Sequence, residues 1–231
     1  IGPDPRNETT FIINDMKASM EPLDKTLMKK KKESRSKFAR QWLQGFRIPR
    51  LPHAVPGTGP HKMKVLIIGS VYPRFDSDAE VPWLRASVAH LRKAGAEVRV
   101  LAPAYKGLRS HAIDGVPVTR FRYAPASLEI LTHEEGAPSK MAKRPWLQLL
   151  AIPYILNGML QCLRLARKEH FDIIHAHWPF PHCFIALPAC RLFHIPLVLN
   201  FHGAELLLLR KKKWIRPFMK FIIGQGDAIF A

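Results

Sequence analysis

From Lys64 to the end of the chain, short apolar runs alternate with segments of helical periodicity. Lys64 to Gly69 reads KVLIIG, a continuous apolar run that ends in glycine, as a buried parallel strand does. Val98 to Ala102, closed by Pro103, is a second run of this kind. In Val116 to Tyr123 the side chains of Thr119, Phe121 and Tyr123 alternate with those of Val118, Arg120 and Arg122. This period of two predicts a strand with one face open to solvent.

The segments between these runs predict helices. Leu84, Val88 and Leu91 fall on one helical face, and the helix has candidate N-caps at positions 76–78, which are Asp76, Ser77 and Asp78. Trp146 to Lys168 predicts a long apolar helix. Ala124 to Arg144, which contains Gly136 and Pro138, is expected to be an irregular, mobile loop over one edge of the sheet.

One stretch, Asp172 to Glu205, predicts strand, crossover helix and strand. Its apolar runs, Ile173-Ile174 and Leu197–Leu199, each end in polar residues that include histidine. A further apolar run begins at Asp227, and because the chain stops inside it at Ala231 we expect a truncated polypeptide. The alternation predicts an α/β domain over residues 63–231, with a Rossmann-like, doubly wound parallel sheet.

Residues 1–62 lack a sustained apolar period. They contain 13 Lys and Arg against 6 Asp and Glu, with a run from Lys29 to Lys32. The composition predicts a basic, disordered leader. Two alternatives stay open: a short basic amphipathic helix over Ser34 to Phe46, and a true start of the protein at Met63.

Composition narrows the class of protein without choosing a partner. The apolar fraction of 47% predicts a core, and the formal charge of +18 favours nucleic acid, nucleotide-bearing substrates or an acidic membrane surface. The three cysteines form no CxxC pair, which indicates reduced core thiols in a cytoplasmic protein. No secretory signal is visible at the start. Pro145 to Leu163 carries no charge, and we interpret it as a buried or surface-docked helix rather than a membrane span.

Histidines mark both strand ends of the central stretch. His175 and His177 would project on one face, and with His182 they make a zinc site conceivable. No carboxylate or thiolate stands at ligand spacing, so we expect no metal. His202-Gly203 is the sharper pair, because imidazole can bond a sugar hydroxyl or phosphate and glycine permits close approach.

Several other activities lack their motifs. There is no GxGxxG, GxxxxGK[ST] or GxSxG, which argues against classical dehydrogenases, P-loop enzymes and serine hydrolases. The basic runs at Lys29–Lys32 and Arg210–Lys213 lack interleaved aromatic residues, so nucleic-acid binding is not expected.

Taken together, four segments resemble the N-terminal half of a GT-B glycosyltransferase of the family 4 type. They are Met63–Asp78, Val81–Pro103 with its ending GAEVRVLAP, Phe171–Ile185 and Pro196–Leu206. The departures are Phe75–Asp78 where paired glycines are frequent, Cys183 where glycine is common and Glu205 where aspartate is common.

The resemblance implies a retaining, metal-independent enzyme that uses no cofactor. It transfers a hexosyl unit from a nucleotide-sugar donor to a glycan or lipid-linked acceptor. His202 would be the catalytic histidine, and the substrate-binding residues would be Gly69, Ser70, Tyr72, Arg74, His177, Trp178, Gly203 and Glu205. A second domain outside this chain would hold most of the donor, so the chain alone is expected to be inactive.

The resemblance also implies a place in the cell. It suggests the cytoplasm, with peripheral contact to an anionic membrane through Arg210–Lys213 and the apolar helix over residues 146–163. The competing hypothesis is a non-catalytic basic α/β module that binds anionic membrane or nucleic acid.

Overall fold

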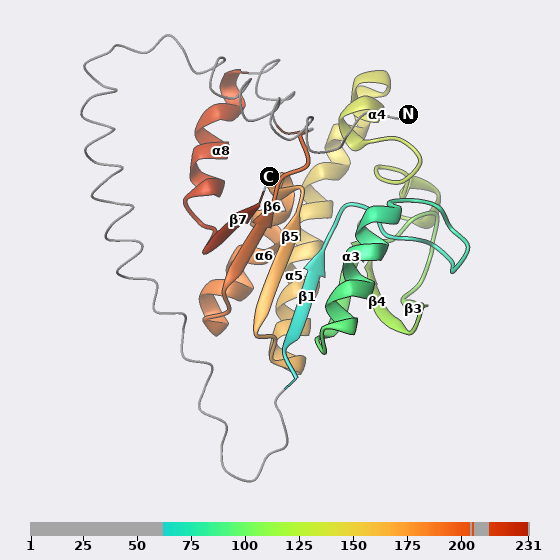
Figure 1. Ribbon diagram of the computed structural model, residues 1–231. Coiled ribbons are helices and arrows are strands. Elements are labelled where there is room, and N and C mark those ends of the chain that lie inside the picture. The colour runs from blue at the N-terminus through green and yellow to red at the C-terminus, as the bar shows by residue number, and fades with distance from the viewer. Residues whose placement is uncertain (1–61, 204, 206–212, 231) are drawn as a thin grey trace, which may run out of the picture. The chain divides into compact units, whose positions relative to one another are not determined.

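Seven strands form one sheet, in the order β3-β4-β2-β1-β5-β6-β7 (Figure 1). The computed structural model describes residues 62–203, 205 and 213–230, so the expected leader and most of the Arg210–Lys213 run lie outside the described residues. The strands are β1 Lys64–Ile68, β2 Glu97–Pro103, β3 His111–Ile113, β4 Val116–Phe121, β5 Ile173–His177, β6 Leu197–Asn200 and β7 Ala228–Phe230.

All neighbouring strands pair in parallel except β3 and β4. The central strand β1 pairs Val65 with Val98 on one side and with Ile173 on the other. The predicted α/β class with a mostly parallel sheet is therefore confirmed.

The β3–β4 hairpin was not predicted. Its turn residues Asp114 and Gly115 both have positive φ, 51° and 70°, as a type I′ turn requires. The Asp-Gly pair is the sequence signal that could have revealed it.

Helices cover the sheet on both faces. The helices are α3 Pro82–Lys93, α4 Ala137–Lys143, α5 Ala151–Glu169, α6 Pro179–Phe193 and α8 Arg216–Ile223, with 3-10 turns at Ala126–Leu128, Pro145–Leu150 and Lys213–Ile215. In Figure 1, α3 lies in front of the sheet, whereas α5 and α6 lie behind it.

The sheet separates two apolar clusters because successive strand side chains point to opposite faces. Val65 and Ile67 of β1 pack with Leu84 and Val88 of α3. Leu66 and Ile68 belong to the larger cluster, under α5, α6 and α8. α5 and α6 approach closely at Gly158, where an added Cβ would lie 2.7 Å from Ile185 Cδ1.

Three local predictions were wrong. β4 is buried on both faces rather than open on one: Thr119 and Arg120 are only 8% and 5% exposed. The reason is that the guanidinium of Arg120 donates hydrogen bonds to the carbonyls of Tyr72 and Pro73, so a charged residue faces the interior.

The start of α3 also differs from the prediction. Val81 is its N-cap and no side chain caps it, while the carboxylate of Asp78 accepts hydrogen bonds from the backbone of Arg74 and Glu80. The third error concerns residues 124–144, which contain a 3-10 turn and α4 and bury Glu129 and His133. The long apolar helix is confirmed, although its first turn, Pro145–Leu150, is a 3-10 turn.

Candidate active site

The carboxyl ends of the parallel strands meet at one edge of the sheet, and most predicted site residues lie there. Gly69 follows β1, Trp178 follows β5, and His202 and Gly203 follow β6. Gly69 is tightly enclosed: an added Cβ would lie 3.3 Å from the carbonyl of Val71 and 3.7 Å from the ring of Trp178. Ser70, beside it, is half-buried.

The His202 ring is half-buried and packs against two tryptophans that also contact each other, with 5.3 Å between their ring centroids. Its centroid lies 4.3 Å from the ring of Trp83, in the first turn of α3, and 4.9 Å from that of Trp178. Gly203 has a φ of +80°, a conformation that side chains rarely adopt, and among the described residues other than its chain neighbours no atom lies within 4 Å of the place a Cβ would take. As far as the described residues show, the space beside this backbone is open next to the imidazole.

The more deeply buried His177 forms a hydrogen bond with His202. Its Nδ1 lies 3.0 Å from Nε2 of His202, and the two rings are nearly coplanar, at 18°. The amide nitrogen of Asn200 also faces Nδ1 of His177, at 3.4 Å. This arrangement favours the tautomer in which His202 Nε2–H donates and His177 Nδ1 accepts.

Both imidazoles are neutral near pH 7. Burial lowers the pKa of His202 to about 4, with the neighbouring His175 as a smaller cause. Burial, followed by the nearby histidines, lowers the pKa of His177 to about 2. Nδ1 of His202 bonds no group among the described residues, so it can accept a hydrogen bond from a ligand hydroxyl.

Glu205 lies under this loop and is 4% exposed. Its carboxylate accepts a hydrogen bond from the backbone N–H of His202 at 3.3 Å, and burial raises its pKa. Since it faces the backbone, Glu205 supports the turn that carries His202 and Gly203.

Tyr72 and Arg74 form a second group, in the loop after β1. Tyr72 is only 1% exposed, and burial raises its pKa to about 12. Arg74 donates to the carboxylate of Asp78 at 2.7 Å, and its guanidinium carbon lies 5.7 Å from the ring centroid of Tyr105. The hydrogen bond from Arg74 lowers the pKa of Asp78 to about 2.

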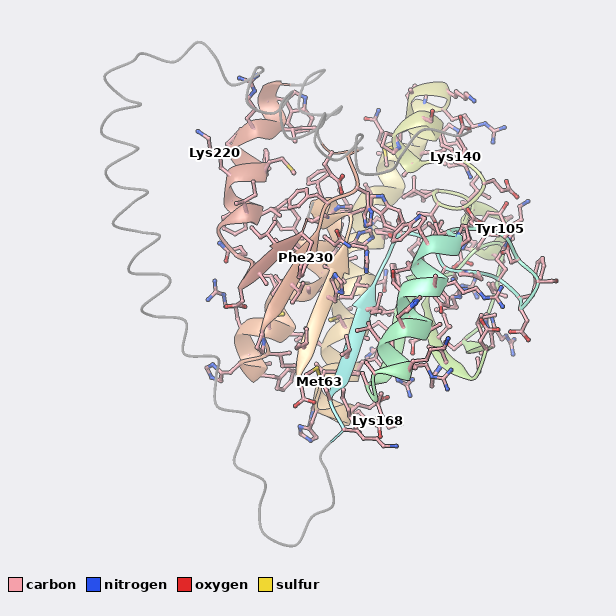
Figure 2. The ribbon with its side chains drawn as sticks, viewed as in Figure 1. Met63, Tyr105, Lys140, Lys168, Lys220 and Phe230 are labelled. Atoms are coloured by element: carbon pink, nitrogen blue, oxygen red, sulfur yellow. The ribbon has the colours of Figure 1, made fainter. Side chains whose placement is uncertain are left out.

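A pocket of about 380 Å³ adjoins this loop, at the end of β2. Its walls combine apolar and cationic side chains; the lining residues are Tyr105, Lys106, Ile130, Glu134, Glu135, Lys140, Lys143, Arg144 and Leu147. Figure 2 shows Tyr105 and Lys140 at this end of the fold, with Met63 and Lys168 at the opposite end. The pocket lies beside Arg74, whose guanidinium is 3.7 Å from the carboxylate of Glu134 in the pocket wall.

No group of three or more His, Cys, Asp or Glu in the described part of the chain is arranged to hold a metal ion. His182 instead bonds the hydroxyl of Tyr154 at 3.0 Å and the carbonyl of Trp178 at 2.8 Å.

A family model described as Glycosyltransferase Family 4 matches residues 84–231, more than half of the chain. The chain belongs to glycosyltransferase family 4. The resemblance inferred from the sequence motifs is thereby confirmed, and the mostly parallel α/β sheet is the Rossmann-like half that a GT-B enzyme of this family contains.

Two curated relatives agree with this assignment. N-acetyl-alpha-D-glucosaminyl L-malate synthase of Bacillus anthracis is 28% identical over 81 residues, which are 34% of this chain and 21% of that protein. An uncharacterised glycosyltransferase of Methanocaldococcus jannaschii is 28% identical over 78 residues, 34% of this chain and 22% of that protein. The matched part therefore spans about a fifth of the length of each relative.

Solved structures resemble the family 4 domain only distantly. MurG of Acinetobacter baumannii has a TM-score of 0.34 and 16% identity, over 60% of this chain and 34% of that chain. The C-terminal domain of a Pyrococcus furiosus hydrogenase has a TM-score of 0.35 and 13% identity, over 62% of this chain and 94% of that chain. At these scores neither carries an argument about function.

Sequence reasoning missed three parts of the candidate site. Trp83 touches His202, and its position in the first turn of the helix after the β1 loop was a usable signal. The sequence contains no comparable signal for Arg120, because the alternating pattern of β4 predicted that its side chain would face solvent. The pocket residues between positions 130 and 144 lie in a segment that the sequence analysis interpreted as a loop, and Leu147 lies in the predicted apolar helix.

Proposed function

We propose that this domain is the acceptor-side half of a retaining glycosyltransferase that uses a nucleotide-sugar donor. It would transfer a hexosyl unit to a glycan or lipid-linked acceptor in polysaccharide or cell-envelope biosynthesis. A second domain, from outside these residues, would hold most of the nucleotide, so the chain alone would be inactive.

One observation carries the proposal: the neutral His202 ring stands beside the open backbone of Gly203, with Nδ1 unbonded within the described residues. An uncharged imidazole that packs against two indole rings is already held in place, so it can orient a hydroxyl of the transferred sugar without first having to reorganise. Gly69, Ser70 and Arg74 would bind the donor phosphate and acceptor from the β1 loop. We expect His177, Tyr72 and Glu205, whose side chains are buried, to shape the site from beneath.

The acceptor would carry an anionic group. Lys106, Lys140, Lys143 and Arg144 outnumber the two carboxylates of the pocket, Glu134 and Glu135, which favours an anion. The name of the Bacillus anthracis relative, which joins a glucosaminyl group to L-malate, supports an acceptor with carboxylates. No metal or cofactor would take part, and the protein would act in the cytoplasm, at times on the inner face of the membrane.

Sugar transfer can be tested with the protein expressed from its whole gene. The purified protein is incubated with a panel of nucleotide sugars and acceptors in the presence of EDTA, and nucleoside diphosphate release and the product anomer are followed by NMR. His202→Ala should reduce turnover by about 100-fold or more while the melting temperature stays close to wild type. Turnover of the variant near wild type, an inverted product anomer or a strict metal requirement would each refute the corresponding part of the proposal.

A further inference from the structure

The outward face of α5 carries an apolar stripe, which we define as Leu149, Ile152, Leu156 and Leu160. These side chains are 74%, 66%, 49% and 46% exposed, and their spacing of three and four residues puts them on one helical face. Leu149 belongs to the 3-10 turn that leads into α5. Four large apolar side chains thus line one continuous strip of solvent-exposed helix.

The stripe is not the core face of the helix. The opposite face buries Tyr154, Gly158, Cys162 and Leu165 against the sheet and α6. The outer side of this helix is apolar as well. Large contiguous apolar surfaces mark interaction sites, so we expect the outer side to bind a partner.

The charges that flank the stripe are mostly positive. Residues 137–168 contain six Lys and Arg and no Asp or Glu, and Glu169, which ends α5, pairs with Arg99. Lys143 and Arg144 are exposed near the start of the helix, and Arg164, Arg167 and Lys168 are exposed towards its end. Within the described ranges, Lys143 alone of these five pairs with a carboxylate, that of Glu135.

The cations and the exposed position of the stripe together favour an anionic membrane as its partner. An amphipathic helix with an apolar strip flanked by Lys and Arg lies in the boundary between lipid headgroups and acyl chains, and anionic lipids attract it. Among the described residues, Pro145–Glu169 is one helix long and apolar enough to cross a membrane, and 28% of its most apolar window is buried in the fold. Because its inner face packs on the sheet and α6, the helix can lie on a bilayer but cannot span one without leaving the core.

We propose that the α5 stripe docks this domain onto an anionic lipid bilayer. The four apolar side chains enter the acyl boundary, and the cations at both ends contact the headgroups. The α5 stripe is thus the surface through which the proposed glycosyltransferase would contact lipid. Membrane docking itself does not depend on the proposed function; only the lipid-linked nature of the acceptor does.

Docking would bring the bilayer to the candidate acceptor pocket. Arg144 and Leu147, immediately before the stripe, line the pocket together with Tyr105 and Lys106 at the end of β2. A lipid-linked acceptor with an anionic headgroup could therefore enter the pocket from the bilayer without leaving it.

The test is sedimentation of the whole 231-residue chain with vesicles, which reads binding and not sugar transfer. Vesicles of phosphatidylcholine with phosphatidylglycerol should bind the chain, vesicles of phosphatidylcholine alone should bind it at least tenfold more weakly, and added salt should reduce binding. Leu156→Ser with Leu160→Ser should lower binding at least tenfold. The control is Leu192→Ser, which changes a leucine of α6 that is 65% exposed and lies outside the stripe, and it should leave binding unchanged.

A second pair of variants separates the stripe from general basic charge. Arg164→Gln with Arg167→Gln should weaken binding to the anionic vesicles several-fold more than Lys93→Gln with Arg109→Gln, which removes two exposed cations elsewhere. Circular dichroism checks that each variant is folded. Equal binding by wild type and the double serine variant would overturn the proposal, because the lipid contact would then lie elsewhere in the chain. A wild-type dimer that the double serine variant abolishes, measured by light scattering, would assign the stripe to a second copy instead.

Discussion

At the scale of single residues, the site depends on which buried polar groups find partners. His177 was predicted to bind substrate, and the structure shows it 2% exposed and hydrogen-bonded to His202. The motif placed both histidines at the correct sheet edge, because strand ends follow from apolar runs. It could not reveal that one imidazole would lie beneath the other, since this depends on how the turn after β6 folds back.

We predict that His177→Phe lowers kcat of the gene-encoded protein about tenfold with little change in KM. Loss of one positioning hydrogen bond of this kind is worth about 1.4 kcal/mol. The control is His175→Phe, since the His175 ring lies 4.3 Å from that of His177 but no hydrogen bond joins it to His202. Nitrogen NMR of the His202 ring should show changed tautomer signals only in the first variant. Equal effects of both variants on turnover and spectrum would refute the positioning role.

Arg120 offers a second prediction at this scale. Its Nε and Nη1 atoms are buried without partners in the described structure, while Nη2 holds the backbone of the β1 loop. Arg120→Ala should lower the free energy of unfolding by about 2–4 kcal/mol, since it leaves a cavity and two carbonyls without a donor.

Arg120→Met should cost under about 1.5 kcal/mol, because it fills the volume and removes the desolvation cost of a buried charge. Urea unfolding measures both variants, and hydrogen exchange of residues 70–78 reports whether the loop loosens. A methionine variant less stable than the alanine variant would show that the charge itself is required.

At the scale of elements, apolar periodicity predicted the strands and helices that carry long runs. It did not predict the local features that depend on side-chain hydrogen bonds, which are the burial of β4 and the start of α3. β4 alternates like an edge strand, but Arg120 bonds the β1 loop and both faces are covered. α3 begins at Pro82 rather than after Asp78, because Asp78 bonds Arg74 and the backbone of the loop instead.

The α5–α6 contact supports a prediction about packing. Gly158→Ala gains helix propensity, worth about 1 kcal/mol, but puts a methyl group 2.7 Å from Ile185 Cδ1, and overpacking costs about 1–3 kcal/mol. Ile185→Val removes that Cδ1 atom and alone should cost about 1 kcal/mol.

In the Gly158→Ala background the same change should cost nothing or stabilise the protein. A double-mutant cycle from urea unfolding measures this coupling, and additive effects would show that the two helices adjust around the new methyl group.

At the scale of the whole molecule, five histidines of the described residues, three buried and two half-buried, dominate the expected response to acid. Burial lowers the pKa of His133 to about 3 and those of His175, His182 and His202 to about 4, with that of His177 near 2. Between pH 6.5 and pH 4 the unfolded chain binds protons that the folded chain does not, so stability is present above this window and is lost as the pH falls through it. Glu205, whose pKa is raised by burial, opposes the trend with one group.

The prediction is a fall in the free energy of unfolding from pH 6.5 to 4, with a slope of up to about 1.4 kcal/mol per pH unit for each buried histidine. Urea unfolding at a series of pH values measures it. His175→Phe should reduce the slope, because it removes one of the histidines whose pKa burial lowers. A flat profile over this range would mean that the histidines are protonated in the folded protein.

The central position of β1 has a consequence for the order of events on the ribosome. β1 is made early, but its partner β5 follows about a hundred residues later, and the backbone N–H of Lys64 bonds the carboxylate of Asp172 across 108 positions. When β1 to β4 and α3 have left the exit tunnel, one face of that half-sheet is covered and the other still waits for α5 and α6. The nascent chain therefore presents an uncovered apolar sheet and an unpaired central edge, the kind of intermediate that chaperones bind, until β5 emerges and closes the fold.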